Sequence, residues 1–311
     1  MPQRILVTGA AGFIGSHLCK HLLRDSSVEI SGIDNLRSGD WSRTPEIVKR
    51  VERDINEFSE ADWRHILEGV EVVYHLAAEK YNSSKSTPER LLATNVLATE
   101  RLARAAAKAE VKRFVFTSSL YAYGSLGPET MTESNLPEPI TLYGASKVMG
   151  EHILRSVDRE LGLSWNVARL FFIYGPRQHA EGGYKSVIIT NFERLLRGEP
   201  AVVFGDGQQS LDYVYVDDCV EALSLLGSSD QSRKLVNIAS GKANSVNDLT
   251  EEMTSIAEQS GKWTIGPADW TAGSRRVGDP SLFERLFDWR ASTPIQEGLR
   301  NVHRWMSEES R

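Results

Sequence analysis

Residues 7–15 read Val-Thr-Gly-Ala-Ala-Gly-Phe-Ile-Gly, and this stretch decides the fold. The apolar run Ile5-Leu6-Val7 before it is typical of a buried strand, and the segment from Phe13 to Leu23 has helical periodicity. Gly9, Gly12 and Gly15 suit a tight turn between the two, because glycine lacks the Cβ that blocks close approach of a diphosphate. A strand, a glycine-rich turn and a helix N-terminus together predict a dinucleotide-type phosphate site.

Length and composition narrow the class of protein. The chain of 311 residues is long enough for one large domain or two. Its net charge of -6 argues against a nucleic-acid partner, since binding to a phosphate backbone requires a basic surface. No apolar run approaches the ~20 residues of a membrane span, and no signal peptide is visible, so we expect a cytoplasmic protein without a membrane partner. Cys19 and Cys219 are expected to be buried thiols rather than a disulfide, and we expect no metal site.

Short apolar runs alternate with helical stretches over the first two thirds of the chain. This alternation predicts an α/β fold of the Rossmann type, with a doubly wound parallel sheet. Strands are predicted at Arg4–Thr8, Val28–Ile33, Val48–Arg53, Val72–Leu76, Arg113–Thr117, Trp165–Leu170, Ala201–Phe204 and Lys234–Ile238. Helices are predicted at Leu91–Ala109, Ser186–Arg197 and Asn247–Gln259, the last capped by Ser245 or Asn247.

The alternation of predicted strands and helices stops after about residue 170, at a long polar and glycine-rich connection. We therefore expect a dinucleotide-binding domain over residues 1–170, with return segments at about 211–240. Residues 171–210 and 241–311 are expected to form a smaller, interleaved C-terminal lobe for the substrate. Such a lobe would close over the carboxyl edge of the sheet, where ligands bind in open α/β folds.

An acidic residue, Asp34, ends the second predicted strand about 20 residues after the glycine turn. A carboxylate there accepts hydrogen bonds from ribose hydroxyls and repels a 2′-phosphate, so NAD is preferred over NADP. Arg37, which is close to Asp34 in the sequence, is the one residue that argues against this preference. Asp54 is placed to meet the adenine, or is an ordinary aspartate at a strand end. Asn95 is either a cofactor residue or a helix cap.

The serine-rich end of the fifth strand and the next helix carry the chemistry. Tyr143 and Lys147 are four residues apart, which places them on one face of a helix. A lysine ammonium beside a phenol favours the phenolate, which predicts that Tyr143 is a general base near neutral pH. Ser119 is placed to hold the same substrate hydroxyl.

With these motifs in place, the chain resembles the extended short-chain dehydrogenase/reductases of the NAD-dependent sugar epimerase/dehydratase family, and most of all the nucleotide-sugar (UDP-sugar) 4-epimerases. The resemblance runs nearly end to end. It rests on the glycine turn, Asp34-Asn35-Leu36, Asp54-Ile55, His75-Leu76-Ala77-Ala78, Asn95-Val96, the serine strand end, Tyr143 with Lys147, Tyr174-Gly175-Pro176-Arg177, Gly205-Asp206-Gly207, Val216-Asp217-Asp218 and Arg276-Val277-Gly278-Asp279.

The resemblance implies tightly held NAD that takes a hydride from a sugar carbon while Tyr143 removes the hydroxyl proton. It also implies that Lys147 contacts the nicotinamide ribose and that the backbone of Phe171 approaches the nicotinamide. The catalytic residues expected are Ser119, Tyr143 and Lys147. The expected cofactor-binding residues are Gly9, Ala11, Gly12, Phe13, Ile14, Gly15, Asp34, Asn35, Leu36, Asp54, Ile55, Leu76, Ala77, Ala78, Lys80, Asn95, Thr117, Tyr143, Lys147 and Phe171.

The residues that vary within the family help to choose the reaction. Relatives that dehydrate or decarboxylate the sugar carry carboxylates directly after the strand-end serine or threonine, whereas this chain has Leu120 and Tyr121. Net reduction usually requires NADPH, which Asp34 disfavours. Epimerisation at C4 through a 4-keto sugar is the best remaining interpretation. A sugar oxidoreductase and a non-catalytic NAD-binding module are the alternatives, and a dehydratase or decarboxylase ranks below them.

The chain departs from the family at two positions in the substrate half. Phe172 replaces a usual asparagine, and Leu211 replaces a usual arginine that binds the nucleotide diphosphate. Arg177, Arg276 or Lys185 is a candidate to compensate, although Arg276 is alternatively a surface ion pair. His179 is expected to be a solvated loop residue. The expected substrate-binding residues are Lys80, Ser119, Phe172, Arg177, Tyr184, Gln209 and Arg276. The family also implies a homodimer, formed through Leu91–Ala109 and the helix of Tyr143.

Overall fold

The computed structural model describes residues 2–125, 129–178, 186–268 and 273–309. Its main feature is a seven-stranded sheet with strand order β11-β6-β5-β4-β1-β2-β3, in which every neighbouring pair is parallel. The strands are β1 (Gln3–Thr8), β2 (Val28–Asp34), β3 (Lys49–Glu52), β4 (Val72–His75), β5 (Arg113–Ser119), β6 (Trp165–Leu170) and β11 (Lys234–Ile238). The predicted doubly wound parallel α/β fold is confirmed.

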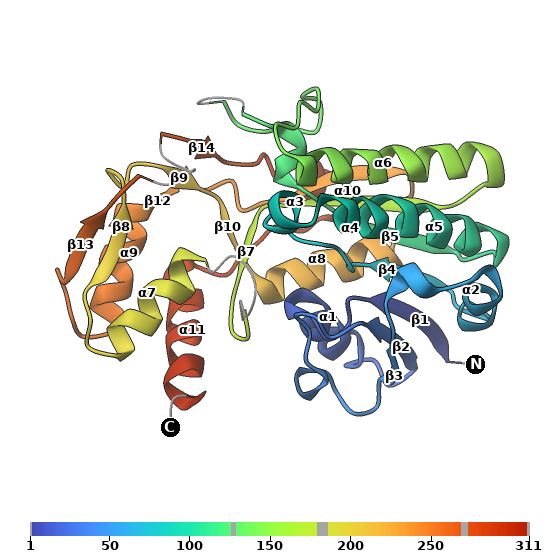
Figure 1. Cartoon of the computed structure of the whole chain (residues 1–311), viewed down its shortest axis with the longest axis horizontal. Coiled ribbons are helices and arrows are strands. Elements are labelled where there is room, and N and C mark those ends of the chain that lie inside the picture. Colours follow the sequence, from blue (N-terminus) through green and yellow to red (C-terminus); the bar gives the residue numbers. More distant parts are fainter. Residues whose placement is uncertain (1, 126–128, 179–185, 269–272, 310–311) are drawn as a thin grey trace.

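Helices cover both faces of this sheet (Figure 1). One layer contains α1 (Phe13–Leu22) and α8 (Val216–Ser228), which pack against each other. The other contains α2 (Glu60–Ile66), α5 (Thr99–Lys108) and α6 (Leu142–Leu161), and α5 packs along α6. Two buried apolar clusters, one on each side, fill the space between sheet and helices, as expected for strands that are apolar on both faces. Cys19 and Cys219 are buried free thiols in α1 and α8, as predicted.

The predicted helix at Leu91–Ala109 is not one regular α-helix. The segment consists of α4 (Pro88–Leu92), a π-helical stretch η3 (Ala93–Ala98) and α5. Asn95 lies inside the π-helical stretch and not at a helix start, so the capping interpretation of Asn95 is wrong. The wider winding is accompanied by the Thr99 hydroxyl, which donates to the carbonyl of Asn95 at 2.9 Å. π-Turns of this kind are frequent at functional sites.

The C-terminal lobe is built from small sheets and short helices. Strand β7 (Phe172–Tyr174) pairs with β10 (Tyr213–Tyr215), and β8 (Ala201–Phe204) pairs with β13 (Trp263–Gly266). A third sheet has the order β12-β9-β14, with β12 (Asn244–Ser245), β9 (Ser210–Leu211) and β14 (Arg275–Arg276). Its helices are α7 (Val187–Leu196), α9 (Val246–Ile256), α10 (Ser281–Phe287) and α11 (Ile295–Glu309). Apart from β8, these strands were not predicted, because most of them are runs of two or three residues, which are too short to show a period.

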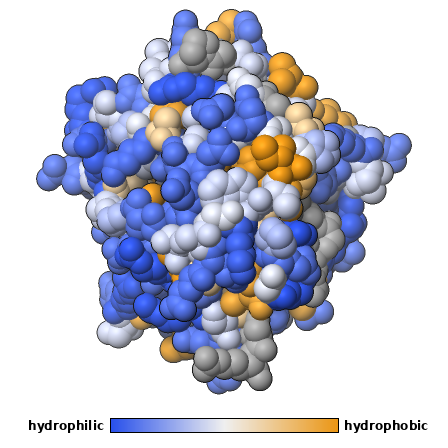
Figure 2. All heavy atoms as spheres, turned by 90° about the vertical axis from the view of Figure 1, so that its left-hand side faces the viewer, coloured by the Kyte–Doolittle hydropathy of each residue, from blue (hydrophilic) through white to orange (hydrophobic). Residues whose placement is uncertain are grey.

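The caps of the lobe helices agree with the sequence in part. Ser186 caps α7, and Ser245 rather than Asn247 caps α9, because the Ser245 hydroxyl accepts from the N–H of Asp248 at 3.0 Å. The exact lobe boundaries stay a prediction. Seen from the lobe end, the surface is largely hydrophilic, with hydrophobic residues in small separate groups (Figure 2). Within the described residues, no helix has the length and apolar character needed to cross a membrane.

Candidate active site

The three predicted catalytic residues come together at the carboxyl end of β5. Ser119 is the last residue of β5, and Tyr143 and Lys147 lie on the first two turns of α6. The helix begins at Leu142 because the side chain of Thr141 caps it, accepting from the N–H of Gly144 at 3.0 Å. The ammonium of Lys147 donates to the carbonyl of Thr117 on β5 at 3.0 Å, so the helix is fastened to the strand.

The electrostatics of this site differ from the expectation. Burial raises the pKa of Tyr143 to about 12, and a hydrogen bond from Ser119 only partly offsets this. Burial also lowers the pKa of Lys147 to about 8, against the opposing charge of Glu151. Burial is the largest influence on both pKa values, so the predicted lowering of the Tyr143 pKa is not seen in the protein by itself. The role of Tyr143 as the base stays a prediction.

A buried histidine supports the strand ends beneath the site. The Nδ1 of His75 lies 2.7 Å from the Thr8 hydroxyl, and its Nε2 lies 2.9 Å from the Thr99 hydroxyl. Since Thr99 donates to a carbonyl, it accepts from Nε2–H, and Nδ1 then accepts from Thr8. Burial, with a smaller effect of the Lys147 charge, lowers the pKa of His75 to about 3. His75 is therefore a neutral structural link between β1, β4 and α5.

The glycine turn has the shape that a diphosphate cradle requires. Gly9 has φ +74°, and a Cβ there would lie 2.9 Å from the backbone N of Ala77. A Cβ on Gly15 would lie only 2.0 Å from the carbonyl oxygen of Gly9. Helix α1 starts directly after Gly12, without a side-chain cap and without an acidic residue in its first turn. The residues present therefore fit a bound dinucleotide, whose phosphates such a helix N-terminus attracts.

Asp34 lies at the end of β2, beside this turn. Its carboxylate accepts from the N–H groups of Ala11 at 3.0 Å and Leu36 at 2.9 Å. Burial raises its pKa, while these hydrogen bonds and the charge of Lys80 act in the opposite direction. A Cβ on Gly39 would lie 2.6 Å from an Asp34 oxygen, so the following loop folds closely over the carboxylate. This position is consistent with the predicted ribose contact.

Asp54 follows the end of β3, and contact of its carboxylate with the adenine stays a prediction. Asp54 caps η2 (Ile55–Glu57) and accepts from the backbone N–H and the side chain of Asn56, from the Asn35 side chain at 2.9 Å and from Arg90 at 2.6 Å. Although burial alone raises it, the pKa of Asp54 is held below its usual value by these hydrogen bonds and by the charge of Arg90. Four donors on one carboxylate fix the end of β3 where we predicted the adenine.

Asn95 bridges two segments that border the site. Its Oδ1 accepts from the N–H of Glu79 at 2.8 Å, and its Nδ2 donates to the carbonyl of Glu79 at 3.0 Å and to the Ser146 hydroxyl at 3.1 Å. The π-helical turn aims this side chain at the loop after β4. Asn95 therefore holds the backbone next to Lys80 in place, and direct contact with the cofactor stays a prediction.

Other predicted cofactor residues line the same edge of the sheet. Leu76, Ala77 and Ala78 follow β4, where the Thr8 hydroxyl accepts from the N–H of Ala77 at 3.2 Å. The Thr117 hydroxyl donates to the carbonyl of His75 at 3.2 Å. Phe171 is buried at the junction of β6 and β7, and its N–H donates to Ile238 at 3.2 Å. The remaining ones are Phe13 and Ile14 at the start of α1 and Ile55 in η2.

In the substrate half, the structure brings Arg276 next to the position of the missing arginine. Strand β14 lies parallel to β9, with Arg276 in register with Leu211, so the two side chains share one face of the small sheet. Arg276 is buried and its guanidinium lies 5.5 Å from the ring centroid of Tyr121, so Arg276 is not a surface residue. Burial lowers its pKa, and Tyr121 and Tyr81 act in the opposite direction.

Aromatic rings connect Arg276 to Tyr143, the predicted catalytic tyrosine. Tyr121, in η4 (Leu120–Tyr123), stacks on Tyr81 with ring centroids 5.4 Å apart and meets Tyr143 edge-on at 5.6 Å. Tyr81 and Tyr121 were not predicted as site residues. The signal was present in the sequence, since Tyr121 occupies a position where relatives carry a catalytic carboxylate.

The other predicted substrate residues differ in their surroundings. Phe172 is half-buried, with its ring 5.8 Å from Tyr213, and Lys80 is exposed. Gln209 is buried, and its side-chain N–H donates to Phe204 at 3.0 Å while its carbonyl oxygen has no hydrogen-bond partner among the described residues. Arg177 has φ +66° and donates to the carbonyl of Arg43 at 3.3 Å, which places it beside the loop after β2. Tyr184, Lys185 and His179 lie outside the described residues.

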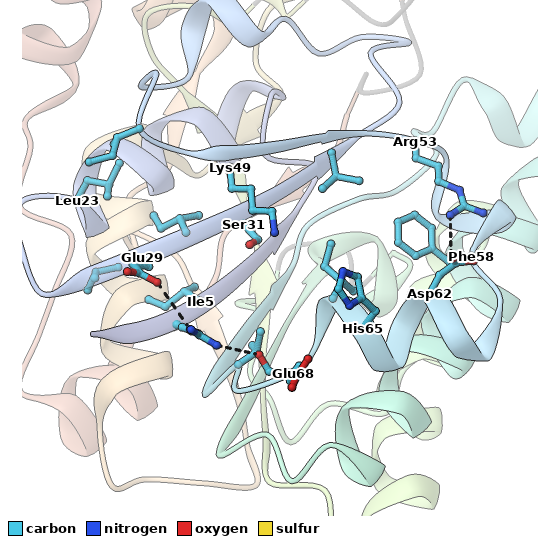
Figure 3. Close-up of a pocket in the computed structure, with 17 residues that line it drawn as sticks. Ile5, Leu23, Glu29, Ser31, Lys49, Arg53, Phe58, Asp62, His65 and Glu68 are labelled. Atoms are coloured by element: carbon cyan, nitrogen blue, oxygen red, sulfur yellow. Dashed lines mark hydrogen bonds and ion pairs between the residues drawn. The ribbon is translucent and has the colours of Figure 1, made fainter. Parts of the chain in front are cut away.

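A cavity of about 710 Å³ lies elsewhere in the described residues (Figure 3). It is lined by the early residues of β1 and β2, by β3 and by α2, and the ion pairs Arg4–Glu29 and Arg53–Asp62 lie at its margin. The predicted catalytic residues are instead at the carboxyl end of the sheet. This cavity is therefore separate from the candidate active site.

Comparison with known proteins agrees with this site. Residues 5–239 match the family model described as the NAD dependent epimerase/dehydratase family. The uncharacterized UDP-glucose epimerase YtcB of Bacillus subtilis is 32% identical, over 98% of this chain and 98% of its own length. The crystal structure of UDP-glucose 4-epimerase from Thermotoga maritima with UDP-glucose has a TM-score of 0.92 at 32% identity, covering 99% of this chain and 100% of that one. UDP-N-acetylglucosamine 4-epimerase from Methanobrevibacter ruminantium also reaches 0.92, at 29% identity and 99% of each chain.

The chain belongs to the NAD-dependent epimerase/dehydratase family. The family, the fold and the dependence on NAD that the sequence predicted are confirmed at this level. The comparisons do not discriminate among sugars, because the relatives named above act on different UDP-sugars by their own descriptions.

Proposed function

We propose that this protein interconverts the C4 epimers of a UDP-sugar, using NAD that it holds throughout turnover. The observation that carries the proposal is the arrangement of Ser119, Tyr143 and Lys147 at the end of β5, next to a turn η4 that contains no carboxylate. This arrangement is sufficient for proton and hydride transfer at one carbon. It lacks the acid that elimination or decarboxylation requires.

The protein's own groups define the proton path. Ser119 hydrogen-bonds Tyr143 and is placed to orient the sugar C4 hydroxyl against the phenol oxygen. Tyr143 in its phenolate form removes the hydroxyl proton as the C4 hydride leaves, which produces a 4-keto sugar. After the keto sugar has rotated, the hydride would return to the opposite face of C4 while Tyr143 returns the proton to the C4 oxygen. Bound NAD supplies the hydride acceptor and a positively charged nicotinamide, which favours the phenolate of Tyr143.

Lys147 has two proposed roles, one toward Tyr143 and one toward the nicotinamide ribose. Its ammonium is fixed by the carbonyl of Thr117 and lies 5.7 Å from the ring centroid of Tyr143. It stabilises the phenolate and is placed to donate to the nicotinamide ribose. Because burial lowers its pKa to about 8, the ammonium form is retained at neutral pH and is lost as the pH rises above that value.

The substrate's diphosphate is assigned to Arg276, with Lys80 and Arg177 as further cations. Arg276 is the buried cation on the same face as Leu211, where other members of the family usually have an arginine. Phe172, Gln209 and Tyr184 are proposed to line the nucleotide. The buried side-chain oxygen of Gln209, which has no hydrogen-bond partner among the described residues, is a suitable acceptor for an N–H of the uracil.

The experiment is incubation of the NAD-bound protein with a panel of UDP-hexoses, UDP-N-acetylhexosamines and UDP-hexuronic acids, followed by chromatography. We expect the C4 epimer of at least one member, with no net change in NADH absorbance. Tyr143→Phe is the matched control and should form the epimer about 1,000-fold more slowly. Steady production of NADH would instead indicate a sugar oxidoreductase, and absence of every C4 epimer would contradict the proposal.

We also propose a homodimer formed through the outer layer of helices. Leu97, in η3, is 55% exposed, and Met149, on the neighbouring α6, is 46% exposed. Apolar side chains at this exposure on two adjacent helices favour contact with a second copy. Sedimentation velocity should show a dimer that Leu97→Glu with Met149→Glu converts to a monomer. A wild-type monomer at micromolar concentration would contradict this.

A further inference from the structure

A row of polar side chains crosses the sheet directly behind the catalytic serine. The parallel registers place Ser118 of β5 beside Arg169 of β6, and Arg169 beside Asn237 of β11. All three are buried, and Arg169 is only 2% exposed. Such a row in a sheet that is otherwise covered by apolar helices is costly unless each group is paired.

Glu151 of α6 pairs with this row. Its carboxylate is 3% exposed and accepts from the Ser118 hydroxyl at 2.6 Å. The guanidinium of Arg169 donates to it twice, through Nε at 2.8 Å and Nη2 at 2.7 Å. This two-pronged geometry fixes direction as well as distance, and a helix held in this way cannot rotate freely over the strands.

The pair is connected to the catalytic residues on both sides. Glu151 is one helical turn beyond Lys147, which is itself one turn beyond Tyr143, so the three share a face of α6. Lys147 binds the carbonyl of Thr117 and Glu151 binds the next residue, Ser118, whose neighbour is Ser119. Two successive turns of α6 are therefore fastened to two successive residues of β5.

The far side of Arg169 reaches the turn that follows Ser119. Its guanidinium lies 4.5 Å from the ring centroid of Tyr123, the last residue of η4. The Tyr123 hydroxyl donates to Asn237 at 2.6 Å. The ion pair thus contacts the helix that carries Tyr143 and Lys147 and also the turn that carries Tyr121.

Few charged groups face the Lys147 ammonium. On its own helix they are Tyr143 and Glu151, from β4 it is His75, and Arg169 follows Glu151 on β6. His75 is neutral above pH about 3. Glu151 is therefore the one carboxylate, among the described residues, whose charge stabilises the ammonium against burial.

We propose that Glu151 is a positioning residue for the reaction: with Ser118 and Arg169 it fixes α6 over the end of β5, and its negative charge keeps Lys147 in the ammonium form. The inference rests on the proposed function only for its effect on turnover. The effect on Lys147 holds whatever the sugar is.

The test compares three variants of the NAD-bound protein. Glu151→Gln keeps the shape and removes the charge. Glu151→Met with Arg169→Met removes both charges without leaving either one buried and unpaired, so that the fold is preserved. Glu160→Gln, on the same helix in an exposed ion pair with Arg104, is the matched control. Thermal unfolding establishes which variants are folded.

Lys147 is titrated directly by NMR on protein labelled with ¹³C at the lysine ε-carbon, with Lys147→Arg used to assign the signal. We expect the titration midpoint to fall by about one pH unit in Glu151→Gln, to fall less in the double Met variant because the repelling charge of Arg169 is removed as well, and to be unchanged in Glu160→Gln. An unchanged midpoint in folded Glu151→Gln would overturn the proposal. This measurement needs no sugar, so it stands if the proposed function fails.

Turnover of whichever UDP-sugar is active gives the second measurement. We expect kcat to fall roughly tenfold or more in Glu151→Gln and in the double variant, with KM little changed, and the alkaline limb of the pH profile to move to lower pH. A purely structural role predicts that the folded double variant recovers wild-type kcat and pH profile, and that result would also overturn the proposal.

Discussion

The predicted cofactor half and the predicted substrate lobe of this protein are built in different ways. In the cofactor half, the predicted residues lie on one strand–turn–helix unit or at neighbouring strand ends, as Gly9 and Gly15 do in the turn before α1. In the lobe, Arg276 reaches Leu211 only because two-residue strands that are distant in the sequence pair in register. A local motif specifies the first site, whereas tertiary pairing specifies the second.

The two predicted sites also differ in the residues that define them. Asp34 and His75 are held by protein hydrogen bonds at the strand ends of the cofactor half. In the lobe, the buried carbonyl oxygen of the Gln209 side chain has no hydrogen-bond partner among the described residues. Variants at the two sites should separate effects on kcat and NAD binding from effects on KM.

The largest effect is expected in the cofactor half, at the proton-transfer residue. Tyr143→Phe removes the phenol that exchanges a proton with the sugar but keeps the ring that packs against Tyr121. We expect kcat to fall about 1,000-fold with NAD affinity near the wild-type value. Steady-state kinetics and calorimetric NAD titration check this, and a variant with more than a tenth of wild-type kcat would exclude Tyr143 as the base.

The second effect concerns the glycine turn. Gly15→Ala places a Cβ 2.0 Å from the Gly9 carbonyl, so the turn must move. We expect NAD affinity to fall about 100-fold or more, while Gly162→Ala, at a helix end with open space around it, changes stability by about 1 kcal/mol and leaves NAD binding intact. Equal NAD affinity in the two variants would contradict the proposal that the glycine turn holds the diphosphate of NAD.

The third effect belongs to the lobe and should leave kcat largely unchanged. Arg276→Met removes the buried cation beside Leu211, and we expect KM for the UDP-sugar to rise about tenfold or more. Adding Leu211→Arg to this variant should recover part of the loss, because the new guanidinium starts from the same face of the sheet. If the double variant binds no better than Arg276→Met, the two positions do not serve the same diphosphate.

The smallest effect is on stability at acid pH, and it arises in the cofactor half. His75 has a pKa of about 3 when folded against an ordinary value of 6.5, so the unfolded chain binds more protons between these values. Stability should therefore fall as the pH drops from about 6.5 towards 3. Urea unfolding at a series of pH values should show this slope in the wild type, and a smaller one in His75→Gln. Equal slopes would show that His75 is not the titrating group.

The features that the sequence predicts are the local ones. The order of alternating strands and helices, the glycine turn and the spacing of Tyr143 and Lys147 are local patterns, and each was found in the structure. The π-helical turn at Asn95 was missed, because one extra residue in a helix hardly disturbs the apolar period.

A sequence motif also could not predict the charge state of the site. The spacing of Tyr143 and Lys147 indicates attraction between them, but their burial depends on everything packed around them, and desolvation reverses the expected shift of the phenol. Glu151 continues the same four-residue spacing and was visible in the sequence. Its partner Arg169 lies on another strand, and only the sheet register reveals the pair.

The most direct test of hydride recycling uses a UDP-sugar that carries deuterium at C4, incubated with the NAD-bound protein in ordinary water. We expect the C4 epimer to form with the deuterium retained at C4, because the same hydride that leaves is returned to the same carbon. Mass spectrometry and NMR of the product measure this. Epimer without deuterium at C4, or deuterium released into free NADH, would contradict the proposed function.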